Sequence, residues 1–342
     1  MLLAAFLGMA GGCQTAPGIV FPPRANAPKW PPPPDAARIT WVGQLTTSAD
    51  LKPGLDALET LGQALFGKEE SRSMLSPIAV CTDNGDRVFV ADSNAQLVHV
   101  FDLNTRKYAM WKPGKDQPQF NQPVGIAWDV HAQRLLVSDS VAGTIFIFNK
   151  DGAYVGQFGA GVLQRPVGLA VDEAQGRVFV ADAKAHQVLI FDPDGKLQRR
   201  LGTRGEGPGQ FNFPTNVALD STGLLYVSDS LNFRVQQFDA QLKPMAAFGK
   251  KGDMPGYFAQ PKGLATDSEG QVYVIDAQFE NVQLFDRQGQ VLMDFGEEGA
   301  APGQFWLPTG IFIDRHDRIW VADSYNRRVQ VFDYRQVQEG AR

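Results

Sequence analysis

Short apolar runs alternate with polar turns along most of the chain, and the same order of runs returns six times. Residues 305–333 hold one full cycle, with a proline, an apolar run ending in Asp314, a second ending in Asp323 and a third closing on Phe332. Runs of strand length separated by turn residues predict an antiparallel meander. One meander cannot bury both of its faces, so we expect the copies to pack on one another.

Three positions of this cycle keep their spacing in the six copies. The aspartate that ends the second run recurs at intervals of 47, 43, 47, 47 and 47 residues, a phenylalanine stands nine residues after it, and a proline opens each copy. The aspartates are Asp92, Asp139, Asp182, Asp229, Asp276 and Asp323. A fourth strand follows turns such as Asp194-Gly195, which favour a hairpin. Four strands in a unit of about 40 to 50 residues are typical of a propeller blade. The sequence therefore predicts an all-β fold, a six-bladed β-propeller of four-stranded antiparallel blades.

The sixth copy ends before its fourth strand. Residues 38–45, RITWVGQL, have the missing strand character, with Val42-Gly43 standing where other copies have Phe-Gly. We expect this N-terminal strand to pair with the last blade and close the ring, which would cover an open strand edge. The polar residues 337–342 are the weaker candidate. The propeller would then span residues 38–342, with its repeats at about 74–334.

A short helix is predicted between the closing strand and the first blade. Four leucines of residues 53–67 (positions 55, 58, 61 and 65) fall on one helical stripe, with proline near the start and glycine at the end. Its simplest place is on the propeller surface.

The N-terminus predicts export. Residues 1–13 are small and apolar and end at Cys13, which resembles a bacterial lipoprotein signal peptide with Ala10-Gly11-Gly12 before an acylated cysteine. The match departs from the pattern in having no Lys or Arg before the apolar stretch and Ala10 where Leu is usual. The alternative is an ordinary apolar N-terminus. Lipidation of Cys13 would leave Cys81 alone, so no disulfide is expected.

The proline-rich residues 14–37 predict an extended, semi-rigid spacer, because proline fixes φ and removes backbone donors. After a lipid anchor, such a spacer would hold a folded domain off a membrane surface. A plain disordered tail fits the same residues.

The net charge and the length of the apolar runs limit the classes of partner that the protein is expected to bind. The net charge of -5 argues against nucleic acid, which usually requires a basic excess. No apolar run is long enough to span a bilayer, so contact with a membrane is expected only through the lipid anchor. We expect a monomer.

The repeat resembles the NHL repeat. The residues that carry the resemblance are Pro166-Val-Gly-Leu-Ala-Val-Asp172, Val321-Ala-Asp-Ser324 and Asn326-Arg-Arg-Val-Gln-Val-Phe-Asp333. The whole arrangement resembles bacterial NHL-repeat lipoproteins. This implies a protein of the bacterial cell envelope that faces the periplasm, and Gln14 resembles the residue of lipoproteins sorted to the outer membrane.

NHL propellers include the peptidyl-hydroxyglycine amidating lyases, which carry metal-binding histidines just after the opening proline. Here those positions hold Ile78, Val124, Val167, Thr215, Lys262 and Thr309. The histidines, at positions 99, 131, 186 and 316, fall elsewhere in the repeat and are not expected to converge on one zinc. No other catalytic motif stands out. We therefore expect no cofactor. The alternative is a lyase or hydrolase with zinc or calcium in the central channel, for which Asn216 and Lys262 are the best placed polar groups.

The six repeated aspartates could be mistaken for a metal cluster. Their strict repetition favours a structural role, in which each caps the turn after its own strand through backbone hydrogen bonds. Arg234 and Arg328 recur in the same way and are interpreted as scaffold residues.

The variable residues of the repeat predict a binding face. The segments around the opening prolines and the loops between second and third strands should share one face, and variable loops on a regular scaffold are typical of binding. The candidates are Ser93, Ser140, Lys184, Asn216, Asn232, Phe233, Lys262, Phe279, Thr309, Tyr325 and Arg327. Each aromatic ring could instead pack inward. We interpret the chain as a non-catalytic, membrane-tethered module that binds a protein or peptide in the cell envelope.

Overall fold

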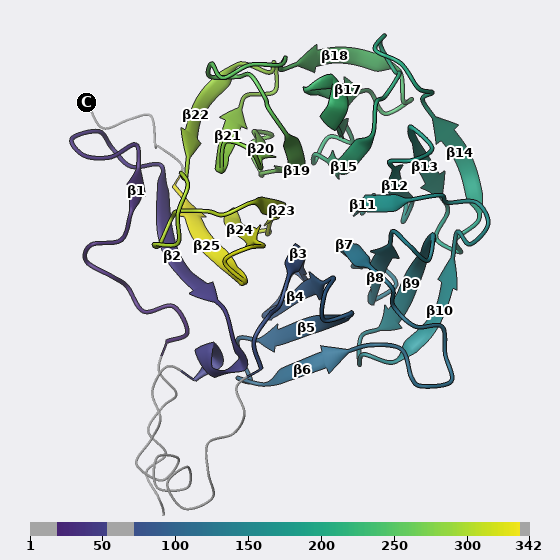
Figure 1. Cartoon of the computed structure of the whole chain (residues 1–342), viewed down its shortest axis with the longest axis horizontal. Coiled ribbons are helices and arrows are strands. Elements are labelled where there is room, and N and C mark those ends of the chain that lie inside the picture. The colour runs from purple at the N-terminus through teal and green to yellow at the C-terminus, as the bar shows by residue number, and fades with distance from the viewer. Residues whose placement is uncertain (1–18, 53–71, 336–342) are drawn as a thin grey trace, which may run out of the picture.

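Six antiparallel sheets surround a central axis in the computed structural model, which describes residues 19–52 and 72–335 (Figure 1). Five sheets have four strands and the sixth has five. The predicted six-bladed β-propeller of antiparallel sheets is confirmed. In the four-stranded sheets the first strand lies nearest the axis and the later strands follow outward in chain order (Figure 1).

The strands of blades 1 to 3 are β3 (Pro77–Thr82), β4 (Arg87–Asp92), β5 (Leu97–Asp102), β6 (Tyr108–Trp111), β7 (Pro123–Asp129), β8 (Arg134–Asp139), β9 (Thr144–Asn149), β10 (Tyr154–Phe158), β11 (Pro166–Val171), β12 (Val178–Asp182), β13 (Gln187–Phe191) and β14 (Leu197–Leu201). Those of blades 4 to 6 are β15 (Pro214–Leu219), β16 (Leu225–Asp229), β17 (Arg234–Phe238), β18 (Pro244–Phe248), β19 (Pro261–Thr266), β20 (Val272–Asp276), β21 (Asn281–Phe285), β22 (Val291–Phe295), β23 (Pro308–Ile313), β24 (Arg318–Asp323) and β25 (Arg328–Tyr334). The described helices are the 3-10 turns η1 (Ser48–Leu51) and η2 (Ser230–Asn232).

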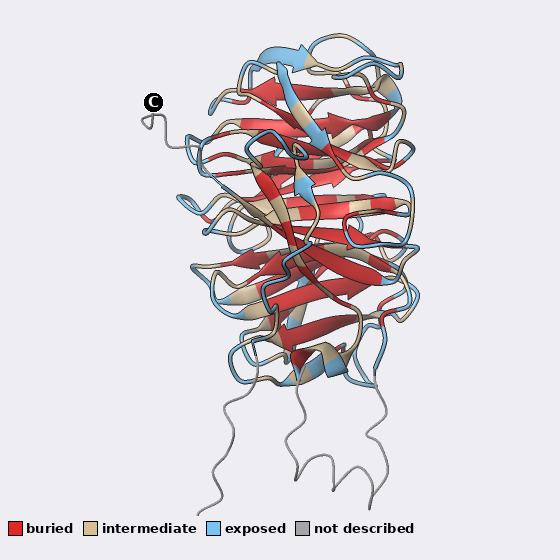
Figure 2. Cartoon of the chain, turned by 90° about the vertical axis from the view of Figure 1, so that its left-hand side faces the viewer, coloured by how far each residue is buried: buried red, intermediate tan, exposed pale blue. Residues whose placement is uncertain are grey.

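The core lies between neighbouring blades. Phe179 and Ile190 of blade 3 pack in one cluster with Val217, Val227 and Phe238 of blade 4. Middle strands are therefore covered on both faces, and every residue of β12 is buried. Figure 2 shows buried residues filling the strands across the molecule and exposed ones mainly at turns and outer strands. This explains the continuous apolar runs that end in the repeated aspartates.

Glycine in the third position of four innermost strands, β7, β11, β19 and β23, lets neighbouring blades approach. A Cβ on Gly310 would lie 2.5 Å from the carbonyl oxygen of Ile78 in blade 1, and one on Gly263 equally close to that of Thr309. No side chain fits at such a distance, so the innermost strands converge tightly around the axis.

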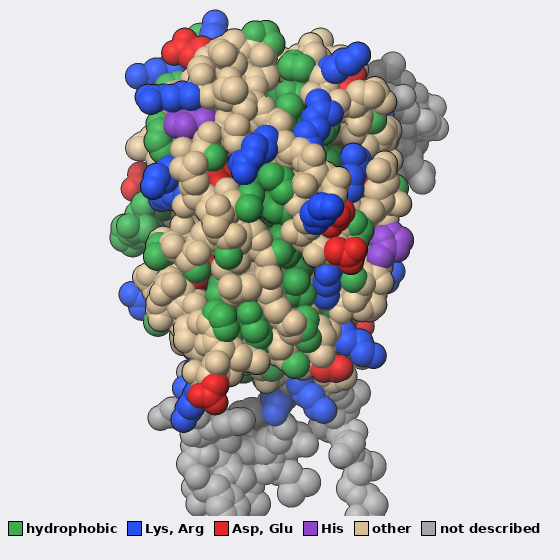
Figure 3. All heavy atoms as spheres, turned by 90° about the vertical axis from the view of Figure 1, so that its right-hand side faces the viewer, with side chains coloured by type: hydrophobic (Ala, Val, Ile, Leu, Met, Phe, Trp, Pro, Cys, Tyr) green, Lys and Arg blue, Asp and Glu red, His purple; other side chains and the backbone are tan. Residues whose placement is uncertain are grey.

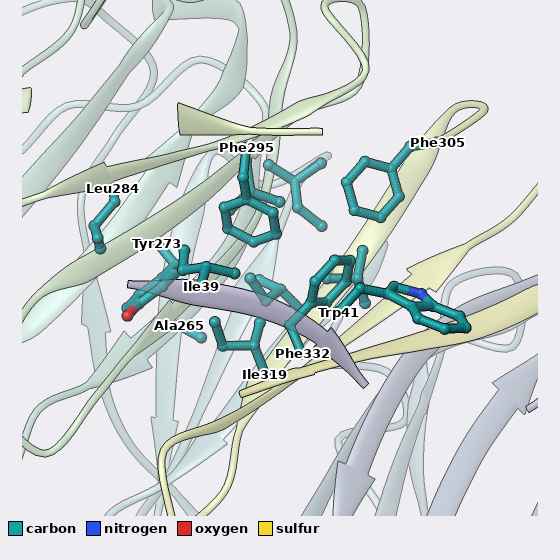
Figure 4. Packing of buried hydrophobic residues seen from close by; sticks show 13 residues of the cluster. Ile39, Trp41, Ala265, Tyr273, Leu284, Phe295, Phe305, Ile319 and Phe332 are labelled. Carbon is teal, nitrogen blue, oxygen red and sulfur yellow. The ribbon is translucent and has the colours of Figure 1, made fainter. Parts of the chain in front are cut away.

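The ring is closed by the N-terminal strand, as predicted. The strand β2 (Ile39–Leu45) pairs antiparallel with β25 as the fourth strand of blade 6, and β1 (Lys29–Trp30) adds a fifth outside it. Ile39 and Trp41 project from β2 into a cluster with Phe295, Phe305 and Phe332 (Figure 4).

The register of this strand differs from the one expected. Leu45 pairs with Val329, as Phe295 pairs with Val282 in blade 5, so Leu45 takes the place of the terminal phenylalanine. The prediction that Val42-Gly43 corresponds to the Phe-Gly pair of the other blades is therefore wrong. Gly43 has a separate role in packing.

Gly43 lies at a bulge of β2, and the ring of Phe21 occupies the space where its side chain would be. Residues 19–37 are thus folded onto blade 6, which differs from the extended spacer predicted for residues 14–37. The Trp30 ring packs 5.8 Å from that of Phe295 and 5.9 Å from that of Phe332, measured between centroids. Aromatic residues among the prolines provide the apolar area that docks this segment.

Three predicted features, the lipidation site Cys13, the helix at 53–67 and the alternative strand at 337–342, lie outside the described residues. Within residues 19–52 and 72–335, no helix has the length and hydropathy required to cross a bilayer.

Candidate functional site

The repeated aspartates hold two loops of each blade together. Asp276 accepts hydrogen bonds from the backbone amides of Ala259 and Gln260, before the opening proline, and from those of Gln278 and Phe279, in the loop between second and third strands. All six aspartates are buried. Buried carboxylates bound in this way fix both loops on one side of the propeller, which we call the loop face. The opposite side carries the turns between first and second strands and is called the turn face.

Blades 4 and 6 add side chains to this arrangement. Arg234 and Arg328 form ion pairs with Asp229 and Asp323 at 2.8 and 2.7 Å, and both arginines also donate to carbonyl oxygens of the segment before the opening proline. The hydrogen bonds thus belong to the scaffold of the loops.

Each loop between second and third strands presents at least one exposed side chain. The residue two positions after the aspartate is exposed in every blade, and the residue four positions after it has a positive φ that turns the chain back. The exposed residues, here called the loop tips, are Asn94, Val141, Lys184, Leu231, Gln278 and Tyr325. The residue type differs at each tip, whereas the backbone conformation of the loop recurs in all six blades.

The structure places Lys184, Tyr325 and Arg327 of the predicted binding residues on the exposed part of the loop face. The Asn232 amide is engaged within the fold, because it donates to the Gly205 carbonyl oxygen at 2.8 Å and to Asp229 at 2.9 Å.

The other predicted residues on this face are partly covered. Phe233 packs beside the core cluster between blades 4 and 5, with the Lys251 ammonium 5.4 Å from its ring centroid, and Phe279 is half-buried. Ser93 is half-buried, and buried Ser140 donates to the Gln122 side chain at 2.9 Å.

Thr309 ties blade 6 to blade 1. Its hydroxyl donates to the carbonyl oxygen of Ile78 at 2.7 Å and lies 2.7 Å from the Ser324 hydroxyl, which itself donates to the Pro77 carbonyl oxygen. Thr215 and Ser230 form the same pair between blades 4 and 5. These hydroxyls contribute to the seams between blades.

On the loop face the predicted residue Tyr325 forms an exposed aromatic pair with Trp306, which was not among the predicted binding residues. Trp306 is 49% exposed and Tyr325 60% exposed, and their ring centroids lie 5.6 Å apart. We call these two residues the aromatic patch. The signal was present in the sequence, because the position two before the opening proline holds Asn or Gln in three other copies and Trp only here.

The six innermost strands enclose a channel of about 1170 Å³. Its wall includes Ile78, Val124, Val167, Leu219 and Ile313, all aliphatic and only half-buried because they face the channel. The aliphatic residues cover the middle of the wall, and polar and charged side chains line both ends, so the cavity combines an apolar surface with polar groups as ligand sites do.

The two mouths of the channel differ in charge. Arg165 and Lys262 line the mouth at the loop face, whereas all the lining carboxylates stand at or beside the turns of the turn face. These carboxylates are Asp172, Glu173, Asp220, Asp267, Asp314 and Asp317. Arg177 and Arg315 also line the turn-face end, where carboxylates outnumber them, whereas the charged lining residues at the loop-face mouth are both cationic.

Lys262 is the second residue of β19 and is half-buried in the channel wall. Burial lowers its pKa. Among the described residues its ammonium has neither an ion pair nor a hydrogen bond. Asn216, on the neighbouring strand β15, accepts a hydrogen bond from the Val217 amide through its side-chain oxygen.

At the turn face, burial raises the pKa of Asp267 to about 6, and the charges of Asp317 and Glu269 add to the rise. The folded state thus binds more protons than the unfolded state between about pH 4 and 6, so stability falls as pH rises through this window and stays lower above it.

We expect Asp267→Asn to remove this pH-dependent loss of folding stability, which is on the order of 2 kcal/mol in the wild type. Urea unfolding at pH 4.5 and pH 7 would measure it, with the exposed Asp253→Asn as the matched control. Equal pH dependence in the two variants would contradict the prediction.

The four histidines are dispersed. His99 is buried on β5, with its ring nitrogens 3.1 Å from Asp92 and 2.6 Å from the Tyr108 hydroxyl. His186 accepts from the Phe213 amide, while His131 and His316 stand in exposed turns. Across the described ranges, no group of three His, Cys, Asp or Glu side chains is arranged to hold a metal ion.

Comparison with known families agrees with this architecture. Residues 305–332 match the NHL repeat, and residues 168–247 match a family described as six-bladed β-propellers. Together with the six blades, these matches define the class: the chain is a six-bladed β-propeller that contains an NHL repeat at residues 305–332. A comparison with curated proteins finds no significant match.

Several solved structures share the fold. An auxiliary nutrient binding protein from Bacteroides thetaiotaomicron aligns with a TM-score of 0.61 and 14% identity, over 77% of this chain and 70% of that protein. Virginiamycin B lyase from Staphylococcus aureus aligns with a TM-score of 0.57 and 14% identity, over 76% and 96%. A gluconolactonase from Xanthomonas campestris aligns with a TM-score of 0.56 and 17% identity, over 77% and 89%. At such identities the likeness concerns the fold alone.

Proposed function

We propose that this protein is a non-catalytic binding module, lipid-anchored in the bacterial cell envelope on the periplasmic side of the outer membrane, whose loop face binds a protein or peptide. The observation that carries the proposal is the aromatic patch, Trp306 and Tyr325, exposed on loops that buried aspartates hold in place. The nutrient binding proteins that share the fold support a binding role for this architecture.

The patch has the chemistry of an interface anchor. Large aromatic side chains dominate binding energy at protein interfaces, because they cover much apolar area and retain a polar atom for hydrogen bonding. The Tyr325 amide donates to the Trp306 carbonyl oxygen at 3.2 Å, so the backbones of the two loops are joined. A surface ordered before binding loses little conformational entropy when a partner docks.

The neighbouring tips provide selectivity. Leu231 and Val141 are exposed apolar tips on other blades, and Lys184 adds a charge between them in chain order. A partner that reaches from the aromatic patch across the channel mouth would contact several different tips. The variation among blades therefore favours one ordered partner over a repetitive polymer.

The proposal is tested by crosslinking the protein in intact membranes and recovering bound partners. We expect Trp306→Ala/Tyr325→Ala to reduce recovery of the main partner at least tenfold, because truncating anchor residues typically costs about 2 kcal/mol or more. The control is Met245→Ala, which removes an equally exposed apolar side chain from the outer strand β18.

Cys13→Ser is examined in the same preparation and should release the protein from the membrane fraction. Equal partner recovery by the double variant and the Met245→Ala control would overturn the loop-face proposal. Retention of Cys13→Ser in the membrane pellet would overturn the lipid anchor.

A further inference from the structure

We propose that the central channel binds an aliphatic carboxylate, with its carboxylate on Lys262 at the loop-face mouth and its hydrocarbon part along the channel wall. This site is separate from the aromatic patch, and the proposal does not depend on a protein partner. A fatty acid and the free C-terminus of an apolar peptide share this chemistry.

The first argument is the position of Lys262 in the ring of innermost strands. The residue after the opening proline is equivalent in all six blades, and five of them hold Ile78, Val124, Val167, Thr215 or Thr309. Three of these are aliphatic, and the two threonines donate to carbonyl oxygens of neighbouring strands. Lys262 alone brings a charge to this ring.

The second argument is that this charge has no counterion. Among the described residues the Lys262 ammonium is unpaired, and the carboxylates that line the channel stand at the turn face. Asp276, the nearest repeated aspartate along blade 5, is buried and already accepts from backbone amides of the loops. A partly buried ammonium without a partner is unfavourable, and a bound carboxylate would relieve this.

A second donor stands on the adjoining strand. The oxygen of the Asn216 side chain accepts from the Val217 amide, which leaves its amino group free to donate. The Thr215 hydroxyl lies 3.5 Å from the Lys262 carbonyl oxygen, so β15 and β19 adjoin at this height of the channel. An ammonium and an amide donor are suited to a carboxylate.

The third argument is the wall behind these donors. Val167, Leu219 and Ile313 face a channel of about 1170 Å³, ample for a chain of ten or so carbons. Apolar atoms that enter it leave water and cover exposed aliphatic surface. The carboxylates at the turn face would repel an anionic head there, so the head belongs at the loop face.

The channel does not fit other ligand classes as well. A cation would be favoured at the turn face and disfavoured beside Lys262 and Arg165. A sugar would leave hydroxyl groups without partners along the aliphatic middle of the wall, at residues such as Val167 and Leu219. An aliphatic carboxylate would cover the aliphatic wall with its hydrocarbon part and form an ion pair with the Lys262 ammonium.

Calorimetric titration of the full chain with decanoate, below its micelle concentration, tests the proposal. We expect one equivalent to bind, and decanol, which has the same hydrocarbon chain without charge, to bind at least tenfold more weakly. Lys262→Met should weaken decanoate binding at least tenfold and abolish the preference over decanol, whereas Lys262→Arg should retain it. The control is Lys243→Met, an exposed lysine in a turn of blade 4.

The source of the ligand is distinguished by a second pair of probes. The tripeptide acetyl-Val-Ile-Leu with a free carboxylate, and its C-terminal amide, are titrated in the same way. Tighter binding of decanoate indicates a fatty acid, and tighter binding of the free-acid peptide indicates a peptide terminus. Failure of every carboxylate to bind, or equal binding by wild type and Lys262→Met, overturns the proposal.

Discussion

A chain that starts at residue 46 is expected to lose most of the stability of the propeller. It lacks β2, and with it the fully buried side chains of Ile39, Trp41 and Leu45. Burying a large apolar side chain contributes about 1.5–3 kcal/mol, so the three together supply roughly 5–9 kcal/mol. That is comparable with the total stability of most domains. The loss also exposes the edge of β25, which then has no partner strand.

Urea unfolding followed by circular dichroism would measure this effect. The control is a chain that starts at residue 19, which retains β1 and β2. If the two truncated chains unfold at the same urea concentration, the closing strand does not stabilise the ring. A milder variant, Trp41→Phe, keeps most of the ring area and removes the hydrogen bond from the Trp41 indole to the Gln330 side chain at 2.9 Å.

Arg328→Met is expected to destabilise the protein by about 3–5 kcal/mol. The Arg328 side chain is 6% exposed and its partner Asp323 is fully buried, with a separation of 2.7 Å. Removing one member of a buried ion pair leaves the other charge uncompensated. The arginine also donates to the carbonyl oxygens of Ala300, Ala301 and Gln304, and these three hydrogen bonds would be lost as well.

The adjacent Arg327→Met is the matched control, because Arg327 is exposed and makes none of these contacts. The difference in unfolding free energy between the two variants isolates the buried network. A difference below about 1 kcal/mol would show that this network does not hold the loop.

The two destabilising changes should not be additive. Arg328 donates to the Gln44 side chain of the closing strand at 3.0 Å, and Gln330 bonds both Trp41 and Asp323. Residues of one hydrogen-bond network couple, so combining Arg328→Met with loss of the closing strand should cost less than the sum of the two changes.

The fold could be predicted because the information is repeated. An aspartate at the end of each second strand and a phenylalanine nine residues later mark the register in six copies, so a single atypical copy cannot hide the pattern. The closing strand β2 occurs once, so no repeated residues mark its register. Its identity follows from its strand character, but its register depends on a bulge at Gly43 and on Phe21, which only the folded structure brings together.

The candidate site was less predictable, because polarity does not reveal whether a side chain is already engaged. Thr309 and Asn232 have the polarity expected of binding residues, yet they bond carbonyl oxygens 231 and 27 residues away. Trp306 has the residue type of a core position, yet its side chain is 49% exposed. The hydrogen bond from the Trp306 amide to Asp323 fixes this loop in the fold, and the sequence pattern does not reveal it.

The pairing of β2 with β25 has a consequence for the order of folding. The hydrogen bond from Trp41 to Gln330 joins residues 289 positions apart, and the last blade has no fourth strand until this pairing forms. Blades 1 to 5 can form as each is synthesised, but the ring can close only after residue 334 is available. Closing so long a loop is entropically slow, and the incomplete ring exposes β25 meanwhile. We therefore expect the final step of folding to be the slowest, and the newly made chain to be most prone to aggregate just before it.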